Sequence, residues 1–337
     1  MEGGYSLAMR KRGKGIACMF YPIGATSYAN PGAAFVKVNQ DGTAVVFTGA
    51  TDVGQGAKTV LAQIAAEELG IDYRAVTMVT SDTERTPYDF GSVASRVTYV
   101  VGNAVRSAAA DAKRVLLEAA AEVLGVSADG LEASGGWVYV RGFPERRMAV
   151  SEAAARAVAV KGRPPVGSAT FNPVTTFLDP ETGHGKPYPC YVFATQIAEV
   201  EVDTETGEVA VLRIAAAHDC GRAINPMLVE GQIEGGICMG LGYALMEEMV
   251  LEKGRVKNDQ FADYVLPTAL DVPEIGVAVI EEEEPTGPYG AKGIGEPSLL
   301  PTAPAILNAI YDAVGVRIRD LPATPAKILA ALKQGYS

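Results

Sequence analysis

The chain has 337 residues, of which 48% are hydrophobic and 20% charged, a composition typical of a globular protein with a core large enough for two domains. Its net charge of −11 argues against a nucleic-acid partner, which would favour a basic surface. The 4 cysteines have no CxxC spacing and there are only 2 histidines, so a zinc site, a disulfide framework or an iron–sulfur cluster held by this chain alone is not expected.

The N-terminal segment is polar and basic, and no apolar stretch of a secretory signal follows it. The most apolar stretch, near 233–245, is too short to cross a bilayer and is bracketed or interrupted by glutamates. We therefore expect a cytoplasmic protein without a membrane span.

The first half of the chain alternates between strand and helix signals. Residues 33–48 predict a β-hairpin that turns at Asp41-Gly42. The elements expected after it are a helix over 57–69 that stops at Gly70, a strand over 76–81, a loop over 82–96 and an alanine-rich helix over about 100–124.

Residues 126–192 show the least periodicity, and we place the boundary between two lobes, 1–165 and 166–337, within them. The second lobe is expected to contain strands over 196–203 and 209–217, a glycine-dense helix over 226–248, an exposed acidic run over 281–284 and a helix near 303–314. Because strands and helices mix without a strict βαβ rhythm, the sequence predicts α+β lobes rather than a doubly wound sheet.

Two glycine-rich turns of the first lobe are candidate ligand sites. Gly54-Gln55-Gly56 precedes a helix, where free N–H groups suit an anion, although its spacing matches no phosphate-loop motif and a tight turn explains it more simply. In 91–96, the Ser92 and Ser95 hydroxyls can hydrogen-bond a polar cofactor, but Ser95 can equally cap the helix that follows.

The second lobe contributes two more glycine-rich segments. Gly231–Gly236 implies a close approach of either a neighbouring helix or a ligand, and Gln232 is its polar member. Lys292–Pro297 places Glu296 among glycine and apolar residues before a proline-led turn. Such a carboxylate suits a general base, and a surface glutamate near a helix start is the alternative.

In this order, the motifs resemble the molybdenum hydroxylase (xanthine dehydrogenase) family. The resemblance covers nearly the whole chain, and the matching segments are 48–56, 86–96, 218–226, 231–236, 290–297 and 321–325. It implies that the two α+β lobes form the second molybdopterin-binding domain of a xanthine dehydrogenase-type catalytic unit.

The resemblance also implies a molybdopterin cytosine dinucleotide whose molybdenum is held by the pterin and not by this chain. The residues implied to contact this cofactor are Gly54, Gln55, Gly56, Ser92, Ala94, Ser95, Arg96, Gln232, Lys292, Gly293 and Gly295. Glu296 matches the family's glutamate beside the metal and is the implied catalytic base. Tyr21 falls where the family has part of its substrate pocket, although an ordinary buried aromatic fits equally well.

The family carries another half of comparable size before this region. The start at Met1 therefore suggests a separate subunit, most similar to the medium molybdopterin subunit of nicotinate dehydrogenase. The implied partners are a large molybdopterin subunit, a [2Fe–2S] subunit and a FAD subunit. The implied reaction hydroxylates an N-heteroaromatic acid such as nicotinate, with oxygen from water. Purines, aldehydes or aromatic thioesters are alternative substrates, and a noncatalytic assembly or cofactor-insertion scaffold is an alternative of another class.

Overall fold

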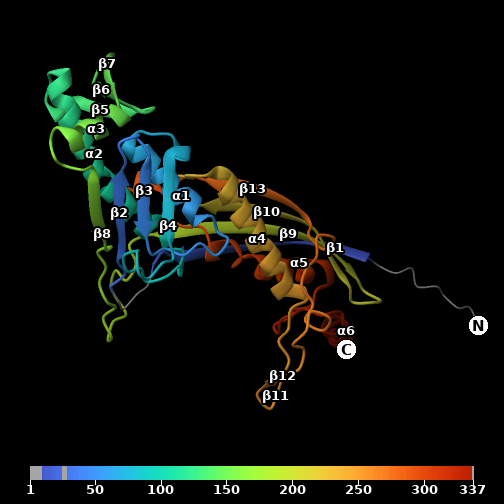
Figure 1. Cartoon of the computed structure of the whole chain (residues 1–337). Coiled ribbons are helices and arrows are strands. Elements are labelled where there is room, and N and C mark those ends of the chain that lie inside the picture. Colours follow the sequence, from blue (N-terminus) through green and yellow to red (C-terminus); the bar gives the residue numbers. More distant parts are fainter. Residues whose placement is uncertain (1–9, 25–28, 336–337) are drawn as a thin grey trace, which may run out of the picture.

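The computed structural model describes residues 10–24 and 29–335 and shows two four-stranded sheets covered by helices (Figure 1). Both sheets mix parallel and antiparallel neighbours, since β3–β4 and β10–β13 are parallel and the other pairs are antiparallel. The expected α+β class is therefore confirmed.

The first sheet has the strand order β4-β3-β2-β8, with bounds Val76–Thr80, Ala44–Thr48, Gly32–Val38 and Val166–Phe171. Strands β2 and β3 form the expected hairpin. Helices α1 (Ala57–Leu69) and α2 (Gly102–Leu124) pack their apolar faces against this sheet. Gly70 ends α1 in the left-handed conformation, as its position predicts.

Residues 126–192 are more regular than their sequence suggests. They form a three-stranded sheet of β5 (Leu131–Ser134), β6 (Trp137–Val140) and β7 (Phe143–Ala149), followed by helix α3 (Val150–Ala159) and by β8. Two of these strands have only 4 residues, and β7 exposes most of its side chains, so an alternating apolar pattern does not develop.

The second sheet has the order β1-β9-β10-β13, with bounds Arg10–Pro22, Tyr191–Asp203, Val209–Asp219 and Glu274–Ile280. Helices α4 (Pro226–Leu245) and α5 (Thr302–Val314) lie across one of its faces (Figure 1). Helix α5 approaches β1 so closely that a Cβ atom on Gly13 would lie 2.3 Å from the carbonyl oxygen of Ala309.

The remaining elements are β11 (Leu251–Glu252), β12 (Arg255–Val256), α6 (Pro325–Gly335) and the short helical turns η1 (Tyr73–Ala75), η2 (Val97–Val101), η3 (Ala128–Gly130), η4 (Pro288–Gly290) and η5 (Glu296–Ser298).

Two strands cross the expected boundary at residue 165. Strand β1 pairs with β9 along its whole length, although it lies in the first range, and β8 pairs with β2, although it lies in the second. Each of the two sheets therefore contains one strand from the other range.

In the described ranges, 10–24 and 29–335, every helix is too short or too polar to cross a membrane.

Candidate active site

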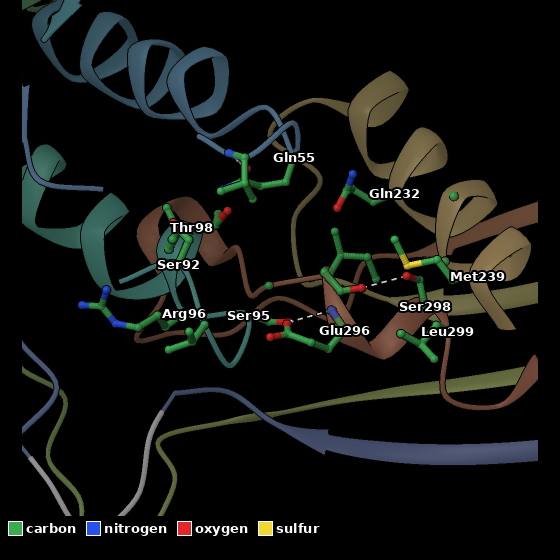
Figure 2. A pocket seen from close by; sticks show the side chains of 18 residues that line it. Gln55, Ser92, Ser95, Arg96, Thr98, Gln232, Met239, Glu296, Ser298 and Leu299 are labelled. Atoms are coloured by element: carbon green, nitrogen blue, oxygen red, sulfur yellow. Dashed lines mark hydrogen bonds between the residues drawn. The ribbon is translucent and has the colours of Figure 1, made fainter. Parts of the chain in front are cut away.

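A cleft of about 370 Å³ lies between the loops of the first lobe and helix α4 of the second (Figure 2). Most of the predicted site residues line it, and they come from segments far apart in the sequence. The lining residues are Val53, Gln55, Ser92, Val93, Ser95, Arg96, Val97, Thr98, Gln232, Gly235, Gly236, Met239, Gly293, Ile294, Gly295, Glu296, Ser298 and Leu299.

Glu296 is the carboxylate of this cleft and begins the short turn η5. The hydroxyl of Ser95 donates a hydrogen bond to Glu296 Oε2 and accepts one from the Glu296 main-chain N–H at 3.2 Å (Figure 2). These two bonds join loops 201 residues apart in the sequence, so a residue of the first lobe orients the carboxylate of the second.

The loop before Val97 presents its main chain to the cleft. Ala94 and Ser95 have φ values of 52° and 50°, a left-handed conformation that is strained for residues other than glycine. No main-chain N–H from Ser92 to Ser95 donates a hydrogen bond to another described residue. Strain and open donors in one loop are typical of a ligand-binding segment.

The alternative role of Ser95, as a helix cap, is wrong. The helical segment begins with the π-helical turn η2, Arg96 occupies the cap position, and no side chain caps the turn. The Ser95 hydroxyl is instead committed to Glu296.

Arg96 lines the cleft, but its guanidinium is paired within the fold. The side chain is fully buried and forms an ion pair with Asp89 at 2.9 Å. It also donates to Asn30 Oδ1 and to the carbonyl oxygens of Pro31 and Gly91. In Figure 2 it points away from Glu296. The guanidinium is therefore not free to bind a phosphate.

The Gly54-Gln55-Gly56 turn reaches the cleft through Gln55 alone. The Gln55 amide closes its own loop by donating to the carbonyl oxygen of Thr51 and accepting from the N–H of Val53. The N–H groups of Gly54 and Lys58 bind the Asp52 carboxylate. Burial tends to raise the pKa of Asp52, but these hydrogen bonds outweigh burial and lower it. The helix start is thus already paired with an anion of this chain.

The glycines of α4 divide between the two explanations that the sequence left open. A Cβ on Gly236 would lie 2.0 Å from Ser298 Oγ, and one on Gly240 would lie 2.4 Å from Thr302 Cβ, so these two allow close packing. Gly231 and Gly235 face open space, and Gly235 lines the cleft. Between them, Gln232 projects into the cleft (Figure 2) and makes no hydrogen bond to another described residue.

This division predicts opposite effects for neighbouring substitutions in the assembled protein. Gly235→Ala should leave the melting temperature unchanged or raise it slightly, since alanine favours a helix by about 0.5–1 kcal/mol. Gly236→Ala should lower stability by about 1–3 kcal/mol, because the added methyl overpacks the contact with Ser298. Equal melting temperatures for the two variants in a thermal unfolding experiment would contradict the assignment.

Lys292 is buried and forms an ion pair with Asp219 at 2.6 Å. It faces a small cavity of about 60 Å³ beside the cleft rather than the cleft itself. The next residue, Gly293, allows the two lobes to meet, since a Cβ there would lie 2.0 Å from the carbonyl oxygen of Ser95. The positive charge that Lys292 could offer to a ligand is therefore already neutralised by Asp219.

Tyr21, the predicted substrate residue, lies on β1 beside Glu296. Burial is the main cause that raises its pKa to about 12, and the negative charge of Glu296 and the nearby Tyr188 add to this. A hydrogen bond with Ser95 acts in the opposite direction. Tyr21 thus remains a protonated phenol at neutral pH, next to Glu296.

Several cleft residues have no sequence signal that would have identified them. Met239 and Leu299 resemble ordinary core side chains, and Thr98 resembles an ordinary helix residue. Behind the cleft, Gln196, His218 and Thr302 are completely buried polar side chains. For Gln196, the only sequence signal of burial is the alternation of side chains along β9. For Thr302, it is the position at the start of α5.

The chain is similar to known proteins over most of its length. Residues 4–273 match the model of the molybdopterin cofactor-binding domain, so the chain belongs to that family. This confirms the resemblance to molybdenum hydroxylases.

Individual relatives are similar to nearly the whole chain. The chain is 38% identical over 327 residues to the putative xanthine dehydrogenase molybdenum-binding subunit XdhA of Escherichia coli (strain K12), covering 94% of this chain and 42% of that protein. It is 34% identical over 335 residues to the 6-hydroxypseudooxynicotine dehydrogenase complex subunit gamma of Paenarthrobacter nicotinovorans, covering 95% and 40%. It also resembles the crystal structure of quinoline 2-oxidoreductase from Pseudomonas putida 86, with a TM-score of 0.87, 29% identity and coverage of 96% and 42%. The chain thus spans about two fifths of the length of these relatives.

Proposed function

We propose that this chain forms the molybdopterin-binding half of a molybdenum hydroxylase and that Glu296 is its general base. The observation that carries this proposal is the placement of Glu296 in the cleft, where Ser95 from the other lobe anchors one oxygen of its carboxylate. The other oxygen, Oε1, accepts no hydrogen bond from a described residue and can receive a proton.

The donors of the cleft fit a molybdopterin. The pterin and its phosphate are rich in hydrogen-bond acceptors. The cleft presents the N–H groups of Ser92–Ser95 and the amide of Gln232, which donate no hydrogen bond to any described residue. Gly235 adds no side chain to the cleft wall beside Gln232. We propose the cytosine dinucleotide form of the cofactor.

When bound, the molybdenum cofactor supplies the transfer of a water-derived oxygen and accepts two electrons. The protein supplies position and one base. Glu296 takes up the proton that this transfer releases, and Ser95 keeps its carboxylate turned toward the reacting centre. Gln232 and the main chain of 92–95 hold the cofactor from both lobes.

The proposed substrate is an N-heteroaromatic acid of the nicotinate type, hydroxylated on a ring carbon with oxygen from water. Two of the compared proteins are named for N-heteroaromatic chemistry or nicotine derivatives, quinoline 2-oxidoreductase and 6-hydroxypseudooxynicotine dehydrogenase. Val53, Val97, Met239 and Leu299 give the cleft apolar walls that suit a flat ring. Xanthine-type purines are the second candidate, because the E. coli relative is named for xanthine.

A companion polypeptide completes the unit in this proposal, and one sheet face suits it. On β1 and β9, the face opposite α5 is charged and ion-paired at one end and apolar at the other. Its apolar patch consists of Ile16, Phe20, Phe193 and Ile197, which are 55%, 68%, 58% and 40% exposed. Exposed apolar groups packed side by side are typical of a binding surface. Partners with [2Fe–2S] and FAD would carry the electrons away.

Cofactor analysis of the purified complex tests the proposed function. We expect molybdenum and a cytosine nucleotide in stoichiometric amount with this chain, together with iron and flavin. We also expect turnover of nicotinate-type heterocycles in ¹⁸O-water to give labelled product. Phe20→Asp should weaken assembly, whereas Leu270→Asp, at an exposed leucine of another loop, should not. A complex without molybdenum would overturn the proposal in favour of a scaffold.

A further inference from the structure

We propose that Gln196 is a positioning residue for Glu296 and acts through the main chain of Ser298. The inference rests on the proposed function and deepens it by naming what holds the base in place from behind. Gln196 lies on β9, on the side of the η5 turn away from the cleft, and is completely buried. A buried amide destabilises the fold unless its donors and acceptor are paired, so its partners indicate its role.

All the polar groups of the Gln196 amide are paired. Its Nε2 donates to the carbonyl oxygen of Ser298 at 2.8 Å and lies 3.1 Å from His218 Nε2, while its Oε1 accepts from the Thr302 hydroxyl at 2.7 Å. A flipped amide would turn its oxygen toward the Ser298 carbonyl, which is also an acceptor, and lose the bond. The three partners therefore admit one orientation of the amide.

His218 supports this orientation by remaining neutral. Burial lowers its pKa to about 4, so at neutral pH one ring nitrogen accepts and the other carries hydrogen. Because Gln196 Nε2 is the donor, His218 Nε2 is the acceptor and the hydrogen is on Nδ1. That Nδ1 is buried without a hydrogen-bond partner in the described structure, a destabilising arrangement. Among the described residues, the one hydrogen-bonded atom of this imidazole is Nε2, and it faces Gln196.

Ser298 connects Gln196 to Glu296, which lies two positions earlier in the same turn. The Ser298 hydroxyl donates to the carbonyl oxygen of Gly295 at 2.7 Å, which closes the turn around Glu296. Helix α4 packs closely against Ser298 at Gly236, where a Cβ atom would not fit. Among described residues, the Glu296 side chain itself is hydrogen-bonded to Ser95 alone. The direction of the carboxylate thus depends on Ser95 in front and on Gln196 behind.

The test compares variants of the assembled, molybdenum-loaded complex. Gln196→Met keeps the size of the side chain and removes its hydrogen bonds. We expect kcat to fall by about 10- to 100-fold, the range that a displacement near 1 Å produces, with little change in KM and an unchanged molybdenum content. Hydrogen exchange of the amides in 293–299 should become faster. Thr302→Val, which removes one bond to Gln196, should change kcat and exchange in the same direction by less.

Two comparisons separate positioning from a general loss of stability. Asn103→Leu removes buried hydrogen bonds of another amide, to the carbonyl oxygens of Tyr99 and Thr286, and should leave kcat per molybdenum unchanged. Adding Gln196→Met to Glu296→Gln should cause no further loss of turnover, because the base it positions is already gone. An additive loss in the double variant would overturn the inference.

The outcomes also distinguish the inference from the proposed function. If Glu296→Gln keeps its activity, the proposed base is wrong, and the inference fails with it. If Glu296→Gln is inactive but Gln196→Met and Thr302→Val keep the kcat and exchange rates of the unmodified complex, the inference alone is wrong. Should Gln196→Met fail to assemble, Thr302→Val and the exchange of 293–299 decide in its place.

Discussion

Glu296→Gln is expected to lower kcat of the assembled enzyme by about 10²- to 10⁴-fold, the usual contribution of a general base. The substitution keeps the shape of the side chain, and the amide oxygen can still accept the hydrogen bond from Ser95. The charge of the carboxylate and its capacity to take a proton are lost. Molybdenum content should therefore stay near that of the unmodified complex, and steady-state kinetics normalised to molybdenum would show the loss.

Glu234→Gln is the matched control for this experiment. Glu234 is an exposed residue on α4, between Gln232 and Gly235, and it does not line the cleft. It loses the same charge close to the site without touching the proposed machinery, so its turnover should be unchanged. A Glu296→Gln complex with turnover comparable to that of Glu234→Gln would show that another group accepts the proton.

The sequence predicts the local elements well because their signals are local. The hairpin at Asp41-Gly42, the end of α1 at Gly70 and the glycine-dense helix each follow from a few neighbouring residues. The strand exchange between the lobes does not follow from neighbouring residues. The pairing of β1 with β9 joins residues about 180 positions apart, and neither sequence indicates its partner strand. Periodicity reveals that a strand exists, but not which sheet it joins.

The site shows the same contrast between residue type and residue partner. The motifs identify Ser95, Gln232 and Glu296, which the structure brings to one cleft. They equally identify Arg96 and Lys292, whose cationic groups the structure pairs with Asp89 and Asp219. A cationic side chain in a glycine-rich motif fits an anionic cofactor or an internal carboxylate equally well, and the choice depends on what packs around it.

Arg96→Met tests that distinction and should destabilise the protein by about 3–5 kcal/mol, because it leaves Asp89 buried without its counter-ion. The carbonyl groups of Pro31 and Gly91 lose their donor as well. Denaturant unfolding of the complex, followed by a spectroscopic signal of this chain, would measure the change. If Arg96 instead served to bind the cofactor, stability measured without cofactor would be little affected.

The double variant Arg96→Met with Asp89→Leu makes this prediction specific to the ion pair. Removing both charges avoids an unpaired buried carboxylate, so the pair of changes should be less destabilising than Arg96→Met alone. Arg96→Lys should behave like Arg96→Met in direction, because a lysine ammonium cannot reproduce the forked bonds to Asn30, Asp89 and two carbonyl groups. A lysine variant with full stability would mean that charge alone suffices here, and the geometric role assigned to the guanidinium would be wrong.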